Sequence, residues 1–264
     1  MRIGLATLMA CVLVTASCGG KAPKFTQSEI AGNWQLTLTP TGGGATRTGG
    51  GLLGQIDQVG LGGTLRGGMI LSGSCGGKGT VTGLVDRQDV TINFGQTGQN
   101  LALTGIVSTD NSSMSGTYVT SVTTCGVSEN GTFTAAAVQP LNGSFTATLT
   151  STSGGGTTTA TGMISQAVDP TGGTLAVLTG SITATTSPCL PMDGNGDLPT
   201  FTGSISGGTV VGLTLAAADG TGTLGTINGT SSLDGKSINT GNYSFTSLGG
   251  GSVCDAGSAT VTLP

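Results

Sequence analysis

The stretch that decides the fold is Gly32-Asn33-Trp34-Gln35-Leu36-Thr37-Leu38-Thr39, which returns as Gly143-Ser144-Phe145-Thr146-Ala147-Thr148-Leu149-Thr150. In both copies apolar residues alternate with small or polar residues, mostly Thr. A period of two is typical of a β-strand with one buried face. The same alternation recurs at Val90-Ile92-Phe94, Leu101-Leu103, Val211-Leu213-Leu215 and Val261-Leu263. Since no long window beyond the first eighteen residues keeps the helical apolar period of about 3.6 residues, we predict an all-β protein.

The repeat also predicts the domain organisation. Near the end of each copy, Ser115-Gly116-Thr117-Tyr118 is echoed by Thr240-Gly241-Asn242-Tyr243. Internal similarity at this spacing indicates two duplicated domains, which we place at residues 31–138 and 139–264. The proposed boundary lies at Gln139-Pro140, where a proline interrupts the strand pattern.

Turn residues between the apolar runs predict how the strands connect. Asn-Gly and Asp-Gly pairs recur about every eight to twelve residues, as an up-and-down meander requires. We expect two tandem antiparallel meander barrels or flattened sandwiches. The Gly-x-Trp opening at residues 32–34 resembles the start of lipocalin and avidin-type barrels. The pairs that predict turns are Asn130-Gly131, Asn142-Gly143, Asp219-Gly220, Asn228-Gly229 and Asp234-Gly235.

Amino-acid composition indicates whether the chain folds and whether it binds nucleic acid. The chain has 51 Gly and 8 Pro among 264 residues, which approaches the level typical of disordered proteins. Positive mean hydropathy and only 8% charged residues argue against disorder, because charge is too sparse to keep the chain open. The sequence pI of about 4.4 disfavours binding to nucleic acid.

The first residues are typical of an export signal. Arg2 precedes an apolar run, residues 3–14, that is too short to span a bilayer. The run ends in Val14-Thr15-Ala16-Ser17-Cys18, which resembles the lipobox of bacterial lipoproteins. This resemblance implies a signal peptide over residues 1–17, acylation of Cys18, and a tether over residues 18–30. With Gly19 after the cysteine, it also implies an outer-membrane location, on the periplasmic face or at the cell surface.

The remaining cysteines predict two disulfides. Cys11 lies in the signal and Cys18 carries lipid, so four cysteines remain, two in each copy. Of the three possible connectivities, only Cys75–Cys125 with Cys189–Cys254 allows each domain to fold alone. Export to an oxidising compartment favours these bonds. The duplicated plan, with these cysteines and the Ser-Gly-Thr-Tyr segment, resembles Gly/Thr-rich acidobacterial lipoproteins with two lipocalin- or avidin-like domains, a resemblance that implies no activity.

Candidate chemistry is sparse. The absence of histidine excludes histidine-based triads and imidazole-ligated metals. Asp193-Gly194-Asn195-Gly196-Asp197 resembles the opening of a calcium loop, but Leu198 and Ser204 replace residues that an EF-hand requires. The alternative is a polar loop beside Cys189. We predict no metal site, and Asp193, Asn195 and Asp197 are the residues that a calcium ion would use.

Three classes of function remain. The first is a structural or interaction protein of the bacterial envelope, held on the membrane by its lipid. The second is a lipocalin-like module that binds a small apolar ligand inside a barrel. The third is an enzyme that uses carboxylates alone, which would need two acids held together with one strongly desolvated. We predict the first class, with no catalytic residue and no cofactor.

Overall fold

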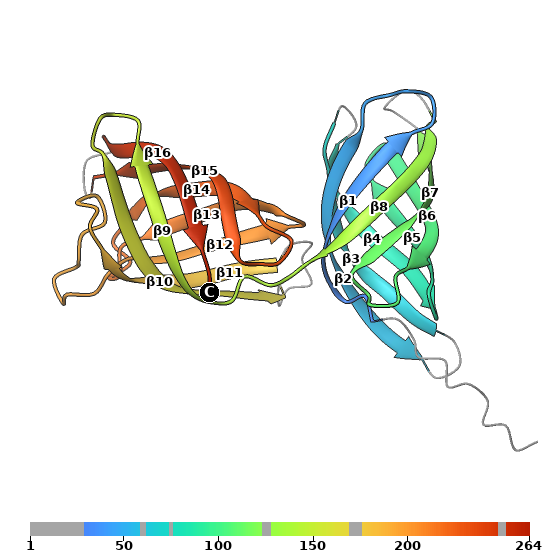
Figure 1. Ribbon diagram of the computed structural model, residues 1–264, viewed down its shortest axis with the longest axis horizontal. Coiled ribbons are helices and arrows are strands. Elements are labelled where there is room, and N and C mark those ends of the chain that lie inside the picture. The colour runs from blue at the N-terminus through green and yellow to red at the C-terminus, as the bar shows by residue number, and fades with distance from the viewer. Residues whose placement is uncertain (1–28, 59–61, 74–75, 123–127, 169–175, 248–251) are drawn as a thin grey trace, which may run out of the picture.

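A computed structural model describes residues 29–58, 62–73, 76–122, 128–168, 176–247 and 252–264. It shows two closed antiparallel barrels, each of eight strands in meander order (Figure 1). The described residues contain no helix. The predicted all-β class is confirmed, and the sheets close into barrels rather than flattened sandwiches. The predicted signal peptide, Cys18 and nearly all of the tether lie outside the described residues.

The first barrel, barrel 1, is built from consecutive hairpins, and β8 closes it by pairing with β1. Each neighbouring pair of strands is antiparallel, so every strand finds both of its partners within the barrel and no edge is left open. The strands are β1 Gly32–Pro40, β2 Arg47–Gln58, β3 Gly62–Leu71, β4 Gly77–Asp86, β5 Asp89–Gln96, β6 Gln99–Val107, β7 Ser113–Val122 and β8 Asn130–Val138.

The second barrel, barrel 2, repeats the plan, with β16 closing onto β9. The opening strands β1 and β9 are the two copies of the repeated octapeptide. The strands of barrel 2 are β9 Gly143–Ser151, β10 Thr157–Val168, β11 Ala176–Thr185, β12 Thr200–Ser206, β13 Thr209–Ala216, β14 Thr223–Ser231, β15 Ser237–Thr246 and β16 Val253–Thr262.

Alternation along each strand sends the apolar residues inward. In β5, Val90, Ile92 and Phe94 are buried while their neighbours are exposed or half-buried. In β9, Phe145, Ala147 and Leu149 are buried and the threonines between them are exposed. Each barrel therefore has its own apolar core, because side chains in a strand alternate between the two faces of the sheet.

Strand glycines make room for the few aromatic rings. In barrel 1, a Cβ placed on Gly105 or Gly116 would lie 2.9 Å from the ring of Phe133. In barrel 2, Gly162 leaves space for Phe145 in the same way, and Phe145 meets Phe201 edge to face at 5.8 Å. Glycine in a strand costs conformational entropy, and here burial of an aromatic ring against the glycine offsets that cost.

Three of the five predicted turns are wrong. Asn130-Gly131 opens strand β8, Asn142-Gly143 leads into strand β9, and Asn228-Gly229 lies inside β14. At Asn228 the register between β14 and β15 shifts, so the Asn-Gly pair marks an irregularity in a strand rather than a hairpin. Asp219-Gly220 and Asp234-Gly235 do occupy turns, where both glycines adopt positive φ.

Candidate functional site

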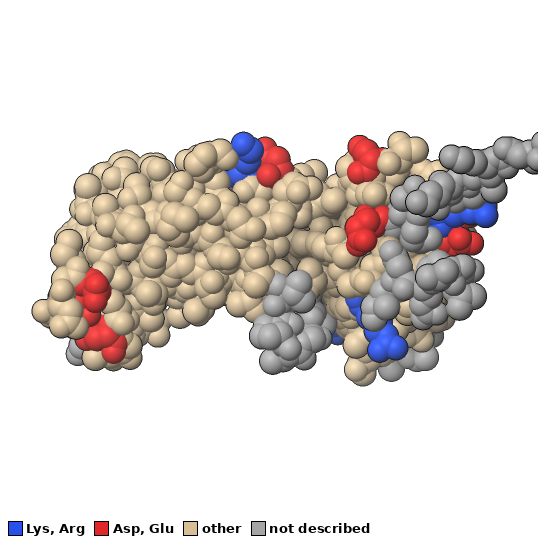
Figure 2. Space-filling view, turned by 90° about the horizontal axis from the view of Figure 1, so that it is seen from below, with Lys and Arg blue, Asp and Glu red and all other residues tan. Residues whose placement is uncertain are grey.

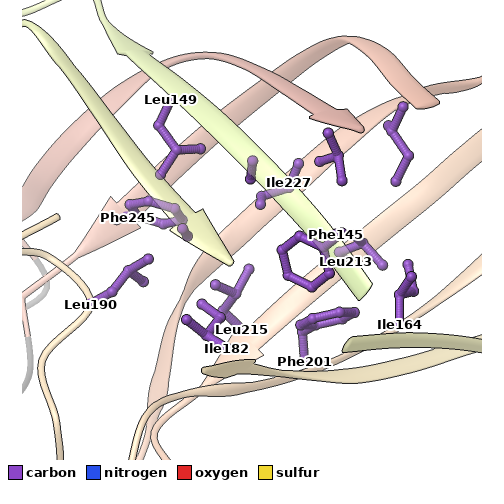
Figure 3. A pocket seen from close by; sticks show the side chains of 14 residues that line it. Phe145, Leu149, Ile164, Ile182, Leu190, Phe201, Leu213, Leu215, Ile227 and Phe245 are labelled. Carbon is purple, nitrogen blue, oxygen red and sulfur yellow. The ribbon is translucent and has the colours of Figure 1, made fainter. Parts of the chain in front are cut away.

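The barrel interiors are packed with side chains. Figure 3 shows the interior of barrel 2, where apolar side chains from many strands converge. The cavity that they leave has a volume of about 30 Å³, and the interior of barrel 1 leaves a cavity of the same size. A site for a small organic ligand typically occupies about 300–1,000 Å³. Neither interior has that room, so the concave surfaces of interest lie outside the barrels.

Each barrel has a tyrosine bound to one carboxylate. In barrel 1 the hydroxyl of Tyr118 donates a 2.6 Å hydrogen bond to Oε1 of Glu129. The same carboxylate oxygen forms an ion pair with Nη2 of Arg47 at a distance of 2.8 Å. Burial, followed by the contact with Glu129, raises the pKa of Tyr118 to about 12. The cluster joins β2 and β7 to the residue before β8, and so fixes one rim of barrel 1.

Barrel 2 contains the counterpart without the cation. The hydroxyl of Tyr243 donates to Asp255 at 2.7 Å, and the hydroxyl of Ser151 donates to the other carboxylate oxygen at 2.6 Å. Burial and the bond to Asp255 raise the pKa of Tyr243 to about 12. Hydrogen bonds, from Ser151 first, lower the pKa of Asp255. Both tyrosines are buried, and the hydrogen bond from each hydroxyl to its carboxylate connects neighbouring parts of the barrel.

The barrels meet through backbone and amide contacts. The side-chain amide of Asn33, on β1, donates to the carbonyl of Gly207 at 2.6 Å and accepts from its N–H at 2.7 Å. Ser206 donates to the carbonyl of Gly50 at 2.7 Å. Gly207 has a φ of +58°, and a Cβ there would lie 2.7 Å from the Cα of Gly50. Only glycine allows this approach, so the turn between β12 and β13 fits closely against β1 and β2.

Apolar contacts complete this junction. Leu52 belongs to β2, yet its side chain is 7% exposed and packs in the core cluster of barrel 2. The backbone N–H of Gln139, in the connection between the barrels, donates to the carbonyl of Leu233 at 2.8 Å. Gly235 packs on the carbonyls of Gln139 and Pro140. The sequence does not reveal these contacts, because Asn33 and Gly207 are 174 residues apart.

A groove of about 380 Å³ lies beside this junction. Its walls come from both barrels and from the connection between them. Amide side chains dominate its polar lining, and Glu29 supplies a carboxylate. The residues that characterise it are Asn33, Leu52, Asn111, Gln139 and Gln166. This junction groove is our candidate functional site, because binding sites form preferentially between domains.

A second depression crosses the outer surface of barrel 1, with a volume of about 450 Å³. It lies over β4, β5, β6 and β7, and its lining includes Thr82, Asn93, Asn100 and Val119. Its polar lining consists of hydroxyl and amide groups, whereas amides predominate in the junction groove. No charged residue is found among the described residues that line this depression.

The predicted cysteine and calcium residues have different outcomes. Cys189 and Cys254 form the predicted disulfide, with their Cα atoms 5.9 Å apart. Cys75 and Cys125 lie outside the described residues, as does Cys18. In the candidate calcium loop, Oδ1 of Asp193 accepts hydrogen bonds from the N–H groups of Asn195 and Asp197. This oxygen therefore closes the loop as an Asx turn does.

The described ranges contain neither a cluster of metal ligands nor a helix that could span a membrane. No group of three or more His, Cys, Asp or Glu side chains is arranged to hold a metal ion in those ranges. No helix among the same residues is long and apolar enough to cross a membrane.

Several carboxylates accept hydrogen bonds from residues of the turn in which they lie. Asp110 accepts bonds from Ser108 and Ser112, which lower its pKa to about 2.

Comparison with known proteins adds little. No protein-family model matches the chain, and no curated protein matches it. Among solved structures, the chain aligns with kievitone hydratase from Nectria haematococca at 8% sequence identity, over 89% of this chain and 90% of that one. The TM-score of this alignment is 0.26.

Proposed function

We propose that this chain is a lipid-anchored structural or interaction protein of the bacterial envelope that acts through its outer surface. The observation that carries the proposal is the packing of both barrel interiors, each with a cavity of only about 30 Å³. A barrel that carries an apolar ligand needs a lumen about ten times larger. The lumen-binding alternative is therefore disfavoured, and the surfaces left for function are the outer faces and the junction groove.

The anchor in this proposal is Cys18. The lipobox-like segment of residues 14–18 motivates it, and the Cys189–Cys254 disulfide fits a protein exported to an oxidising compartment. Two or more acyl chains hold a protein on a membrane stably, since each buried CH₂ contributes about 0.8 kcal/mol. The tether would then place barrel 1 nearer the membrane and barrel 2 farther from it along the chain.

The proposal includes no catalytic centre. Histidine, the usual acid–base group near neutral pH, does not occur in the sequence. The described carboxylates with lowered pKa values, such as Asp110, Asp219 and Asp234, accept hydrogen bonds from their own turns. A carboxylate-only mechanism needs a desolvated acid beside an ionised one, and these acids stay ionised and exposed.

Membrane fractionation of cells that express the full chain tests the anchor. The wild-type chain should be processed, incorporate labelled palmitate and remain with the membrane fraction. Cys18→Ala should give soluble protein or an uncleaved precursor, with no label. Cys11→Ala, in the signal itself, is the matched control and should behave as wild type. A processed Cys18→Ala chain that stays on the membrane would contradict the proposal.

A further inference from the structure

The connection between β11 and β12 distinguishes barrel 2 from barrel 1. It comprises fourteen residues, 186–199, whereas the equivalent connection between β3 and β4 comprises five, residues 72–76. It contains no helix or strand. Connections of this length without secondary structure are uncommon in compact domains, and many of those that occur act as lids or binding loops. We call residues 186–199 the cap.

The cap closes one end of barrel 2. Strand β12 runs from the cap to the turn that meets barrel 1, so the cap lies at the far end of barrel 2 (Figure 1). Leu190 of the cap is 2% exposed and lines the interior cavity (Figure 3). Every other described residue that lines this cavity lies in a strand, as do all described residues that line the cavity of barrel 1. Leu190 therefore acts as a plug that barrel 1 does not have among its described lining residues.

Hydrogen bonds fix the two ends of the cap but not its middle. Backbone bonds of 2.9 Å join Thr186 to β10 and Pro199 to β11. The N–H groups of Cys189 and Leu190 donate to the hydroxyl and the carbonyl of Ser187, at 3.4 and 3.2 Å. From Cys189 to the residue before Pro199, every hydrogen bond found among the described residues stays within the cap. These bonds shape the cap without holding it on the barrel.

Apolar packing and one covalent bond hold the middle of the cap. On the face shown in Figure 2, the far end of barrel 2 bears acidic side chains and no basic ones, so ion pairs on this face do not contribute. Leu190 is buried in the core of barrel 2, and Leu198 packs against this core while only partly buried. The Cys189–Cys254 disulfide joins the cap to β16.

The disulfide is open to attack from one side. Cys254 is exposed, whereas Cys189 is 5% exposed. Exposed disulfides are among those that exchange readily with external thiols. Without the bond, two leucines would have to offset the conformational entropy lost by the whole cap, which contains two glycines and several polar residues. Loss of the bond therefore favours release of the cap.

We propose that the Cys189–Cys254 disulfide is a redox latch, and that its reduction releases the cap and opens the far end of barrel 2. The eight strands stay closed, because their pairing from β9 round to β16 does not involve the cap. Leu190 leaves the mouth of the barrel, and apolar side chains that line the interior become exposed there. This inference does not depend on the lipid anchor.

The reductant is a dithiol, either a dithiol protein or a small dithiol. One of its thiolates attacks the sulfur of Cys254, so that a mixed disulfide forms and Cys189 leaves and takes up a proton. The second thiol of the reductant then attacks this mixed disulfide, releases Cys254 as a thiol and leaves the reductant as a disulfide. Two electrons and two protons pass to the protein, and a disulfide oxidant reverses the reaction.

Hydrogen exchange of the purified full chain, with and without dithiothreitol, tests the latch. In the oxidised chain the amides of Cys189 and Leu190 should exchange slowly. After reduction they should exchange about a hundredfold faster or more, while the strands of barrel 2 stay far slower than an unstructured chain, as expected for local opening. Reoxidation should restore slow exchange. Fluorescence of anilinonaphthalene sulfonate should rise on reduction, because this dye binds exposed apolar surface.

Three variants separate the latch from other effects. Cys189→Ser combined with Cys254→Ser should show fast exchange in the cap without reductant and no further change with it. Leu190→Ala, with the disulfide intact, should keep slow exchange at Cys189, because the bond still holds the cap. Cys75→Ser combined with Cys125→Ser should respond to dithiothreitol as wild type does, since the reagent would also reduce a bond between these two cysteines.

The proposal would be overturned by slow exchange at Cys189 and Leu190 in the fully reduced chain, which would mean that packing alone holds the cap. Fast exchange that spreads through the strands of barrel 2 would also overturn it, because the disulfide would then hold the whole barrel rather than the cap. So would fast exchange in oxidised Leu190→Ala, or a disulfide that dithiothreitol reduces only after the protein is unfolded in urea.

Discussion

At the scale of single residues, glycine does much of the packing in this protein. Gly116 lies against the ring of Phe133, and a Cβ there would also come within 2.1 Å of the carbonyl of Thr104. Gly116→Ala should therefore lower the free energy of unfolding by about 1–3 kcal/mol, as overpacking typically does. Urea denaturation measures this. Gly42→Ala, at a position with no atom within 4 Å, is the control and should unfold as wild type does.

The lowered pKa of Asp255, in barrel 2, predicts that folding stability depends on pH. The folded pKa of Asp255 is lowered, so its contribution to stability is present above the ordinary carboxyl pKa of about 3.9 and is lost as pH falls through the lowered value. Asp255→Asn should reduce stability at neutral pH and weaken its decline in acid. Urea denaturation across this range measures both effects. Asp89→Asn, on the outer surface of barrel 1, should change neither; an unchanged acid profile in Asp255→Asn would contradict the assignment.

Tyr243, which donates a hydrogen bond to Asp255, predicts how folding stability changes at alkaline pH. A pKa raised to about 12 means that the neutral form of Tyr243 is favoured by folding. Its contribution is therefore present below the ordinary pKa of about 10 and is lost as pH rises towards 12. Tyr243→Phe should remove this part of the alkaline destabilisation. Spectroscopic titration of tyrosine ionisation should show the raised pKa directly, and titration near 10 for both buried tyrosines would contradict it.

At the scale of strands and hairpins, sequence patterns predict the two barrels but not the contacts between them. Alternation in the two octapeptides predicts β1 and β9, and it correctly places Trp34 and Phe145 inside. The same alternation cannot show that Leu52 packs in the other barrel, because its neighbours look like those of any outward strand residue. Gly207 is one of 51 glycines, and nothing local distinguishes it. Partners 174 residues apart become visible only when both barrels are folded.

The junction between barrels should unfold as part of one cooperative unit. Asn33→Ala removes both hydrogen bonds to Gly207 and leaves its buried peptide groups without partners, which typically costs about 1–3 kcal/mol. We expect calorimetry to show one transition for wild type and two for Asn33→Ala, with faster proteolysis near Gln139. Asn100→Ala, on the exposed surface of β6, is the matched control. Two transitions in the wild-type chain would show that the junction does not couple the barrels.

The disulfide in barrel 2 joins the residues after β11 to β16 across a separation of 65 residues. Closing a loop of this size contributes about 4 kcal/mol by restricting the unfolded chain. Cys189→Ala and Cys254→Ala should each lower stability by a similar amount, and the double variant should add little more. Urea denaturation of the three variants measures this. Additive losses in the double variant would show that the effect comes from packing of Cys189 rather than from the bond.

At the scale of the whole molecule, two filled barrels are joined through β1, β2 and the turn between β12 and β13, and we propose that a lipid anchor displays them. Composition predicts the filled interiors only in part. Alternating Leu, Val and Ile indicate an apolar interior, but whether that interior is hollow depends on how rings such as Phe133 and Phe201 fit against strand glycines. That fit is a property of the closed barrel and is absent from any short stretch of sequence.

Native mass spectrometry of the chain, extracted from cell envelopes in mild detergent, distinguishes filled barrel interiors from interiors that hold a ligand. We expect the mass of a polypeptide that begins at Cys18 and carries its acyl groups, with no small molecule bound inside either barrel. The contradicting result is a stoichiometric apolar ligand that leaves the protein only on unfolding. Such a ligand would mean that the barrels open to hold it and that function lies in the lumen rather than on the surface.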